Sequence, residues 1–291
     1  MGGRDESRKS IKSSYILEVF FNANTITNIE YKDMPNVPHF FSAATFGSFK
    51  GRNLIMGGFN SKKCLEFEQE ELQENWEILE NQYIPSLNAC RCFAASTFIQ
   101  NKVVVAGGSK PTPLDTIEIL DWDESNHGSQ WIQSPSRLPI VVHGHTLVTL
   151  NDKLFLIAGH DGSNRLDKIW RGRFDKLNNR ISWVEMGLRL QKKRFLHFSF
   201  VISNKIITFG GANVDDDFVE IIENNTVKQG PKVPFKLNTR YDQAVLDRKN
   251  RISITSKEHG LIVYDHQQGT FKNYNNFKLR EERTRFAAIL Q

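Results

Sequence analysis

Short apolar runs that end in small residues recur along this chain at intervals of about fifty residues. Four of these runs are clear, at residues 54–58, 103–108, 154–160 and 206–211. Their first glycines are Gly57, Gly107, Gly159 and Gly210, so the successive steps are 50, 52 and 51 residues. A regular period of this length is the signature of a repeat protein, in which each unit buries its apolar face against the next. The chain of 291 residues is therefore predicted to form one domain of about six units.

The segments within each unit follow the same order. A short apolar segment precedes the glycine-ended run, and a polar turn such as 100–102 or 151–153 separates the two. After the glycines come a polar loop, a third β-prone segment, a second turn and a fourth segment that carries a large aromatic residue. Asn- and Asp-rich turns between β-prone runs are typical of hairpins. Each unit is thus predicted to be a four-stranded antiparallel sheet, with strands a, b, c and d.

The glycines and the aromatic residues of the repeat have separate packing roles. A glycine can end strand b where the backbone bends near a crowded axis, and a large aromatic side chain can fill the wedge between two stacked sheets. His160 replaces the second glycine of one unit, and a fifth run at 251–256 has no glycine. The predicted structural positions are Gly2, Gly3, Gly57, Gly58, Gly107, Gly108, Gly159, Gly210, Gly211, Trp76, Trp131, Trp183 and Phe271.

This order of apolar run, diglycine, strand and tryptophan resembles the kelch repeat, and the resemblance extends over essentially the whole chain. It implies an all-β fold, a six-bladed kelch-type β-propeller. The expected blades span about 36–86, 87–138, 139–190, 191–235 and 236–282, and a shared blade is built from 1–35 and 283–291.

The two ends of the chain are expected to share the closing blade. Residues 15–31 would supply strands c and d, and residues 285–290 would supply strand a. About eight residues, the length of one strand, are missing between these pieces when they are aligned on the repeat. We therefore expect a closing blade that lacks one strand, which suggests that the sequence is a fragment of a longer chain.

Composition narrows the class of protein. The net charge is +5, which permits acidic partners but does not call for nucleic acid. No apolar stretch is long enough for a membrane-spanning helix, and the polar first residues do not resemble a signal peptide. The three cysteines, Cys64, Cys90 and Cys92, are too few for a disulfide framework or a zinc site. A cytoplasmic or nuclear protein without cofactor or metal is expected, and its oligomeric state is left open.

Basic residues recur at the predicted start of strand a. Counting 16 residues back from the first glycine gives Arg91, His143 and Arg194. The d–a and b–c loops share one face of a propeller, so we predict a ring of basic groups around a channel mouth there, attractive to carboxylate or phosphate. The alternative is that each arginine pairs with a nearby carboxylate or loop carbonyl and only supports the fold. The predicted partner-binding residues are His39, Arg91, His143, Arg194, Arg240, Arg285, Lys192, Lys193 and Arg165.

Catalytic and metal-binding patterns are weak in this sequence. It has no Gly-x-Ser-x-Gly elbow, His-Glu-x-x-His pair or phosphate-binding loop. His143 and His145 have the spacing of metal ligands but lack a third ligand nearby. The run Asp215–Asp217 could hold Ca²⁺, although such a run is more often a solvated loop.

The sequence is therefore interpreted as a non-catalytic module that binds an acidic or phosphorylated protein segment on the d–a/b–c face. The family resemblance further implies a role in substrate recognition within a ubiquitin-ligase adaptor. Two alternatives stay open. One is an enzyme that acts on a small anionic or sugar-like substrate at the channel mouth, and the other is an actin or cytoskeletal scaffold.

Overall fold

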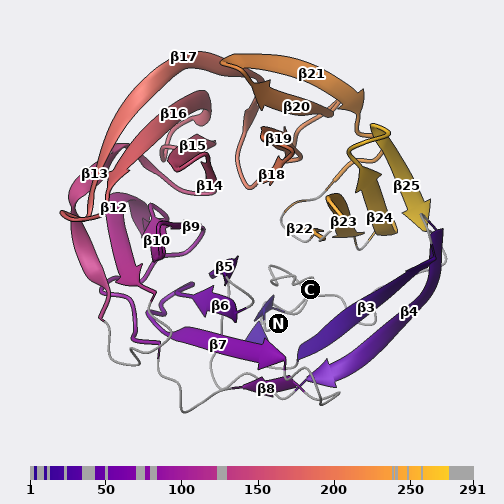
Figure 1. Cartoon of the computed structure of the whole chain (residues 1–291), viewed down its shortest axis with the longest axis horizontal. Coiled ribbons are helices and arrows are strands. Elements are labelled where there is room, and N and C mark those ends of the chain that lie inside the picture. The colour runs from indigo at the N-terminus through magenta and orange to yellow at the C-terminus, as the bar shows by residue number, and fades with distance from the viewer. Residues whose placement is uncertain are drawn as a thin grey trace.

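The structure is a computed structural model. It describes residues 3–4, 10–11, 14–22, 25–34, 43–49, 52–69, 76–78, 84–122, 130–237, 239, 242–247, 249–256 and 258–274. Every helix or strand assigned in these ranges is a β-strand. Four-stranded antiparallel sheets stand around a common centre like the blades of a propeller (Figure 1). The predicted all-β propeller with antiparallel four-stranded blades is confirmed.

Blades 1 to 5 follow one another along the chain, and each runs from an inner to an outer strand (Figure 1). Blade 1 consists of β5 (Thr45–Phe49), β6 (Arg52–Met56), β7 (Cys64–Gln69) and β8 (Trp76–Ile78). Blade 2 consists of β9 (Ala95–Ile99), β10 (Lys102–Ala106), β12 (Thr112–Asp121) and β13 (Ile132–Val142), and the short β11 (Ser109–Lys110) pairs with β12.

The other three blades repeat this meander. Blade 3 consists of β14 (Thr146–Leu150), β15 (Lys153–His160), β16 (Arg165–Asp175) and β17 (Arg180–Arg194). Blade 4 consists of β18 (Phe198–Ile202), β19 (Lys205–Phe209), β20 (Phe218–Glu223) and β21 (Thr226–Lys232). Blade 5 consists of β22 (Gln243–Leu246), β23 (Arg251–Ser256), β24 (Gly260–Asp265) and β25 (Thr270–Tyr274).

The predicted count of six blades is not what the structure shows. The described residues form five four-stranded blades, and the two-stranded sheet of β3 (Ser14–Asn22) and β4 (Thr25–Met34) stands in the ring between blades 5 and 1 (Figure 1). A separate pair, β1 (Gly3–Arg4) and β2 (Ser10–Ile11), lies near the centre. The strand predicted at 285–290 lies outside the described residues, as does Gly2.

The core lies in the seams between blades. In β10, Val103 and Val105 belong to the cluster shared with blade 1, whereas Val104 belongs to the cluster shared with blade 3. Successive side chains of a strand point to opposite faces, and both faces of β10 are covered, so the run is apolar throughout. Trp131 is buried in the seam between blades 1 and 2, and Trp183 packs against the seam between blades 2 and 3. The predicted wedge-filling role thus agrees with the structure for these two residues.

In blade 3 the pair of residues that ends strand b lies one position earlier in the chain than the glycine alignment predicts. Strand b ends in two consecutive residues with positive φ, at 62° and 89° for Gly107 and Gly108. The corresponding pair in blade 3 is Ala158 and Gly159, at 50° and 104°, and the register of β15 shifts between Ile157 and Gly159. Ala158 therefore replaces the first glycine, and the expectation that His160 replaces the second is wrong.

This shift changes which residue begins strand a of blade 3. The amide of Gly58 donates to the carbonyl of Arg91 at 3.0 Å, and the amide of Gly108 donates to the carbonyl of Val142 at 2.9 Å. Val142, rather than the predicted His143, is thus equivalent to Arg91. His143 corresponds to Cys92, because each forms an isolated β-bridge with its own b–c segment.

Candidate partner-binding face at the channel mouth

The d–a and b–c segments share one face of the propeller, as the repeat predicts. Cys92 bridges to Ser109, and His143 bridges to His160. In blade 4 the amide of Ala212 donates to the carbonyl of Phe195 at 2.9 Å. Each of these contacts joins the residues before strand a to those after strand b. Loops that are far apart in sequence are therefore held together on one surface.

A ring of backbone hydrogen bonds surrounds the centre of this face. Ala43, Phe93, Gly144 and Leu196 occupy equivalent places before strand a, and all have φ between 55° and 59°. The last three amides donate to the carbonyl of the equivalent residue in the preceding blade: Phe93 to Ala43 at 2.9 Å, Gly144 to Phe93 at 2.8 Å and Leu196 to Gly144 at 2.7 Å. The ring links blades 1 to 4 directly, and it defines the channel mouth.

Arg91 lies beneath this surface and is only 1% exposed. Its guanidinium pairs with the Glu118 carboxylate at 2.7 Å and donates to the carbonyl oxygens of Gly107 and Thr116 at 2.8 and 3.1 Å. Glu118 also accepts hydrogen bonds from the backbone amides of Asn88 and Ala89. The arginine and its carboxylate therefore brace strand a, the end of strand b and strand c of the same blade.

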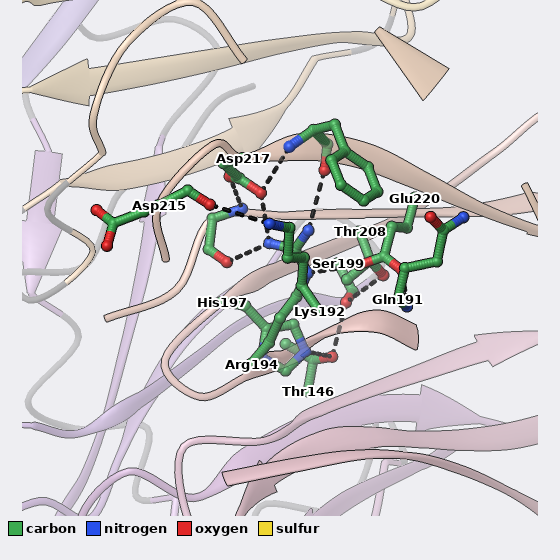
Figure 2. A network of polar contacts seen from close by, with 12 residues as sticks. Thr146, Gln191, Lys192, Arg194, His197, Ser199, Thr208, Asp215, Asp217 and Glu220 are labelled. Atoms are coloured by element: carbon green, nitrogen blue, oxygen red, sulfur yellow. Dashed lines mark hydrogen bonds and ion pairs between the residues drawn. The ribbon is translucent and has the colours of Figure 1, made fainter. Parts of the chain in front are cut away.

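Arg194 makes the same brace in blade 4 and is fully buried (Figure 2). Its Nε donates to Glu220 at 2.8 Å, and one Nη atom pairs with Asp217 at 2.7 Å. The carbonyl oxygens of Gly210 and Phe218, equivalent to those of Gly107 and Thr116, accept its remaining hydrogen bonds. A buried charge needs such compensation, because removal from water is costly.

The predicted basic ring is therefore wrong for the arginines that the structure describes. Arg91 and Arg194 are neutralised by carboxylates and are not exposed on the face. In blade 3 the equivalent position holds Val142, which packs in one apolar cluster with Trp170. The alternative interpretation, in which the arginines support the fold, agrees with these contacts. His39, Arg240 and Arg285 lie outside the described residues, so their part in the ring stays a prediction.

Aromatic and imidazole rings gather at the mouth instead. The ring centroids of His143 and His160 are 5.2 Å apart, and both rings contact Phe195, at 5.8 and 5.5 Å. Phe93 lies 6.3 Å from His143 on the side of blade 2. Burial and the neighbouring His160 lower the pKa of His143 below its usual value of 6.5, which favours the uncharged ring at neutral pH.

The sequence carries a weak signal for this cluster. Phe93 and Phe195 each follow a strand-a arginine within two residues. As apolar residues at the start of a strand, they would be expected in the core, whereas both are half-buried. Only the folded chain brings them together with the two histidines.

Several cations lie on the loops of the same face. Lys62, Lys63, Lys110 and Lys193 are exposed, and none has a carboxylate partner among the residues that the structure describes. Arg165 donates to the carbonyl of Asn213 at 3.2 Å, and its guanidinium lies 6.0 Å from the centre of the Phe195 ring. We call these five residues the cationic rim. Lys193 and Arg165 were among the predicted partner-binding residues.

Lys192 is more engaged than the rim residues. Its ammonium donates to the carbonyl of Asp215 at 3.2 Å and lies 5.6 Å from the centre of the Phe218 ring (Figure 2). It neutralises no side-chain carboxylate in the described part of the chain, but it is held against blade 4. Its predicted role in partner binding stays a prediction.

The three aspartates that follow strand b of blade 4, at residues 215–217, form ion pairs with basic side chains of the same chain. Asp217 pairs with Arg194 and caps the amide of Gly210, so its expected place in a solvated loop is wrong. Asp215 pairs with Lys236 and Asp216 pairs with Lys232, both in exposed positions. Within the described ranges no group of three potential metal ligands comes together.

A cavity of about 310 Å³ opens behind the mouth, between the inner strands. Its described lining includes Phe93, Gly144 and Leu196 of the backbone ring and hydroxyl side chains from several blades. Asp, Glu, Lys and Arg are absent from this described lining. His145 and His197 also line it, and burial lowers the pKa of His145 to about 3, so this ring is uncharged at neutral pH. The described lining of the cavity is therefore uncharged at neutral pH, whereas the loops on the same face carry the cationic rim.

Comparisons with known proteins agree with this architecture. The family described as Kelch motif matches residues 90–125 and 142–171, which lie in blades 2 and 3. Kelch-like protein 41a of Danio rerio is 23% identical over 157 residues, 53% of this chain. The match spans 24% of the length of that relative.

Solved structures show the same fold. The structure titled "Structure of YjhT" matches with a TM-score of 0.66 over 87% of this chain and 88% of the other, at 12% identity. In the described residues no helix is long and apolar enough to cross a membrane. The repeated glycine-ended strands and the blades that they build are those of a β-propeller, and the two matched segments resemble kelch motifs.

Proposed function

We propose that this chain is a non-catalytic protein-interaction module that binds an acidic or phosphorylated segment across the channel mouth. The observation that carries the proposal is the cationic rim, whose positive groups have no carboxylate partners in the described part of the chain. Paired cations such as Arg194 contribute little net field, whereas unpaired exposed cations raise the local potential and attract anionic segments.

A binding role also fits the chemistry of the cavity. General acid–base catalysis needs a carboxylate, a titratable imidazole or a similar group close to the reacting bond. The described lining of the cavity has no carboxylate, and its two histidines are uncharged at neutral pH. This favours binding over the enzymatic alternative. A place in a ubiquitin-ligase adaptor or a cytoskeletal scaffold would add to this activity and rests on the family resemblance.

Charge reversal on the two faces tests this proposal. A random peptide library is selected on the unmodified protein, and enrichment of Asp and Glu is expected. The best acidic peptide should then bind about tenfold more weakly to the Lys110→Glu, Lys193→Glu variant, and its affinity should fall with rising salt. The control, Lys153→Glu with Lys176→Glu, makes the same change in net charge on turns of the opposite face. Selected peptides without acidic residues, or equal losses in the two variants, would overturn the proposal.

A further inference from the structure

The cavity behind the mouth differs in chemistry from the loops around it. The rim is cationic, whereas the described lining of the cavity is uncharged. Phe46, Phe93 and Phe198 contribute aromatic side chains, and Ser96 and Thr146 contribute hydroxyl groups. A ligand that satisfies both regions must be anionic outside and uncharged inside.

The volume of the cavity limits what can enter it. At about 310 Å³ it is at the lower end of the range in which proteins hold small ligands, so it has room for one large side chain rather than a folded segment. Small residues, Ala43, Ala94 and Gly144, stand among those that line it near the mouth. A single anchor residue in a pocket is a common form of interface hot spot.

The described lining of the cavity is an unfavourable environment for an anionic group. Arg91 and Arg194 are buried cations of the described blades, and both are already neutralised by carboxylates. A carboxylate or phosphate that entered would lose its water without gaining a counter-charge from the described lining. The part of the partner that enters should therefore be uncharged.

An aromatic ring with a polar tip matches the lining best. The mouth presents the rings of Phe93, His143 and Phe195, and aromatic pairs gain energy beyond the area that they bury. Deeper in, the Ser96 hydroxyl donates to the carbonyl of Phe46 at 3.1 Å. A hydroxyl oxygen has two lone pairs, so Ser96 and Thr146 have the capacity to accept a hydrogen bond from a phenol.

We propose that the acidic partner segment anchors on this chain through one tyrosine, whose ring enters the cavity beside Phe93 while flanking acidic residues meet the cationic rim. This inference rests on the proposed function, because the flanking acidic residues are those of the segment proposed there. It adds the chemical identity of the anchor.

Short synthetic peptides test the anchor on the unmodified protein. Each has glutamate and glycine on both sides of one central residue, which is tyrosine, leucine, alanine or phosphotyrosine. The peptide with tyrosine should bind about tenfold more tightly than that with alanine by fluorescence polarisation. Phosphotyrosine should remove this gain, since the added charge is excluded from the cavity. A tighter phosphotyrosine peptide, or a leucine peptide equal to the tyrosine one, would overturn the inference.

A double-mutant cycle then locates the contact. Phe93→Ala should weaken the tyrosine peptide several-fold and leave the alanine peptide within about twofold, because only the former loses a ring contact. Leu177→Ala, at a fully different turn on the opposite face, is the control and should change neither affinity. Circular dichroism checks that both variants are folded. If Phe93→Ala does not fold, the peptide series on the unmodified protein still tests the anchor.

The two proposals can fail separately. If all the acidic peptides bind equally well and with the same salt dependence, the tyrosine anchor is wrong and the acidic-segment function stands. If the peptide with tyrosine binds equally well after its glutamates are replaced by glutamine, the acidic-segment function is wrong. Failure of the tyrosine anchor therefore does not imply failure of the acidic-segment function.

Discussion

Arg91 and Arg194 hold the same place in two blades and make the same contacts. Each pairs with a strand-c glutamate, Glu118 or Glu220, and donates to the carbonyl of a strand-b glycine. In blade 3 the same place, a few residues before strand a, is held by the apolar Val142. Ionic and apolar solutions at one structural position are expected, since replacing a whole buried ion pair by apolar groups is often neutral.

This equivalence predicts an asymmetry between single and double variants in blade 2. Arg91→Met should lower the free energy of unfolding by about 3–5 kcal/mol, because it leaves the buried Glu118 carboxylate without a cation. Adding Glu118→Gln should restore a large part of that loss, since the amide oxygen still accepts from the backbone amide of Asn88. Urea denaturation measures both values. A double variant less stable than the single one would contradict the brace.

At the scale of the element, the end of strand b decides how each blade meets the next. Gly107 has φ +62°, and a Cβ added there would lie 2.6 Å from Cε1 of His145 and 2.6 Å from the carbonyl oxygen of Val142. Ala158 takes the equivalent place in blade 3 with φ +50°. The repeat thus demands a left-handed conformation at this point in both blades, and in blade 2 it also demands the absence of a side chain.

Two glycine variants separate these demands. Gly187 in β17 has φ +71°, but an added Cβ would meet nothing within 4 Å. Gly187→Ala should therefore cost only the left-handed conformation, about 1 kcal/mol, whereas Gly107→Ala adds a clash with a neighbouring backbone and should cost about 3 kcal/mol or more. Thermal or urea unfolding compares them. Equal losses would show that conformation alone explains the glycine.

Over the whole molecule, hydrogen bonds between side chains close the seams around the channel. The hydroxyl groups of Thr97 and Thr149 are 2.9 Å apart across the seam of blades 2 and 3. Across the next seam, Thr146 donates to Ser199 at 2.7 Å and contacts Nε2 of His197 at 3.0 Å (Figure 2). His145 occupies the place equivalent to His197 one seam earlier, but among the described residues neither of its ring nitrogens has a hydrogen-bond partner.

The buried histidines predict acid sensitivity of the whole ring. Burial, together with the nearby charged forms of His143 and Arg91, lowers the pKa of His145 from 6.5 to about 3. Below about pH 6.5 the unfolded chain protonates this histidine, whereas the folded chain keeps it neutral down to about pH 3. The stability that the neutral ring allows is therefore fully present above pH 6.5 and is lost as the pH falls towards 3. His145→Leu should therefore flatten the decline of urea-derived unfolding free energy between pH 6.5 and 4.5 by on the order of 1 kcal/mol or more. An unchanged slope would mean that His145 does not set the acid response.

Much of the fold could be predicted from local pattern. The apolar runs, the Asn-rich turns and the glycine period are properties of neighbouring residues, so strands, hairpins and blades follow from them. The alignment of blade 3 could not, because Ala158 adopts a glycine-like φ that nothing in its own residue type indicates. The count of blades also depended on which segments pair, because β3 and β4 occupy the two strands predicted at 15–31 but form a two-stranded sheet among the described residues.

The repeat, the kelch-type blades and the loops that share one face follow from the sequence alone, because strand periodicity and turn chemistry act over a few residues. Which charged groups reach that face depends on the folded chain. Arg91 and Lys110 are both basic residues in segments predicted to lie on the same face. Arg91 is nevertheless buried against Glu118, whereas Lys110 is exposed. The charge that a residue presents depends on burial and on partners brought from other strands, and these exist only once the chain is folded.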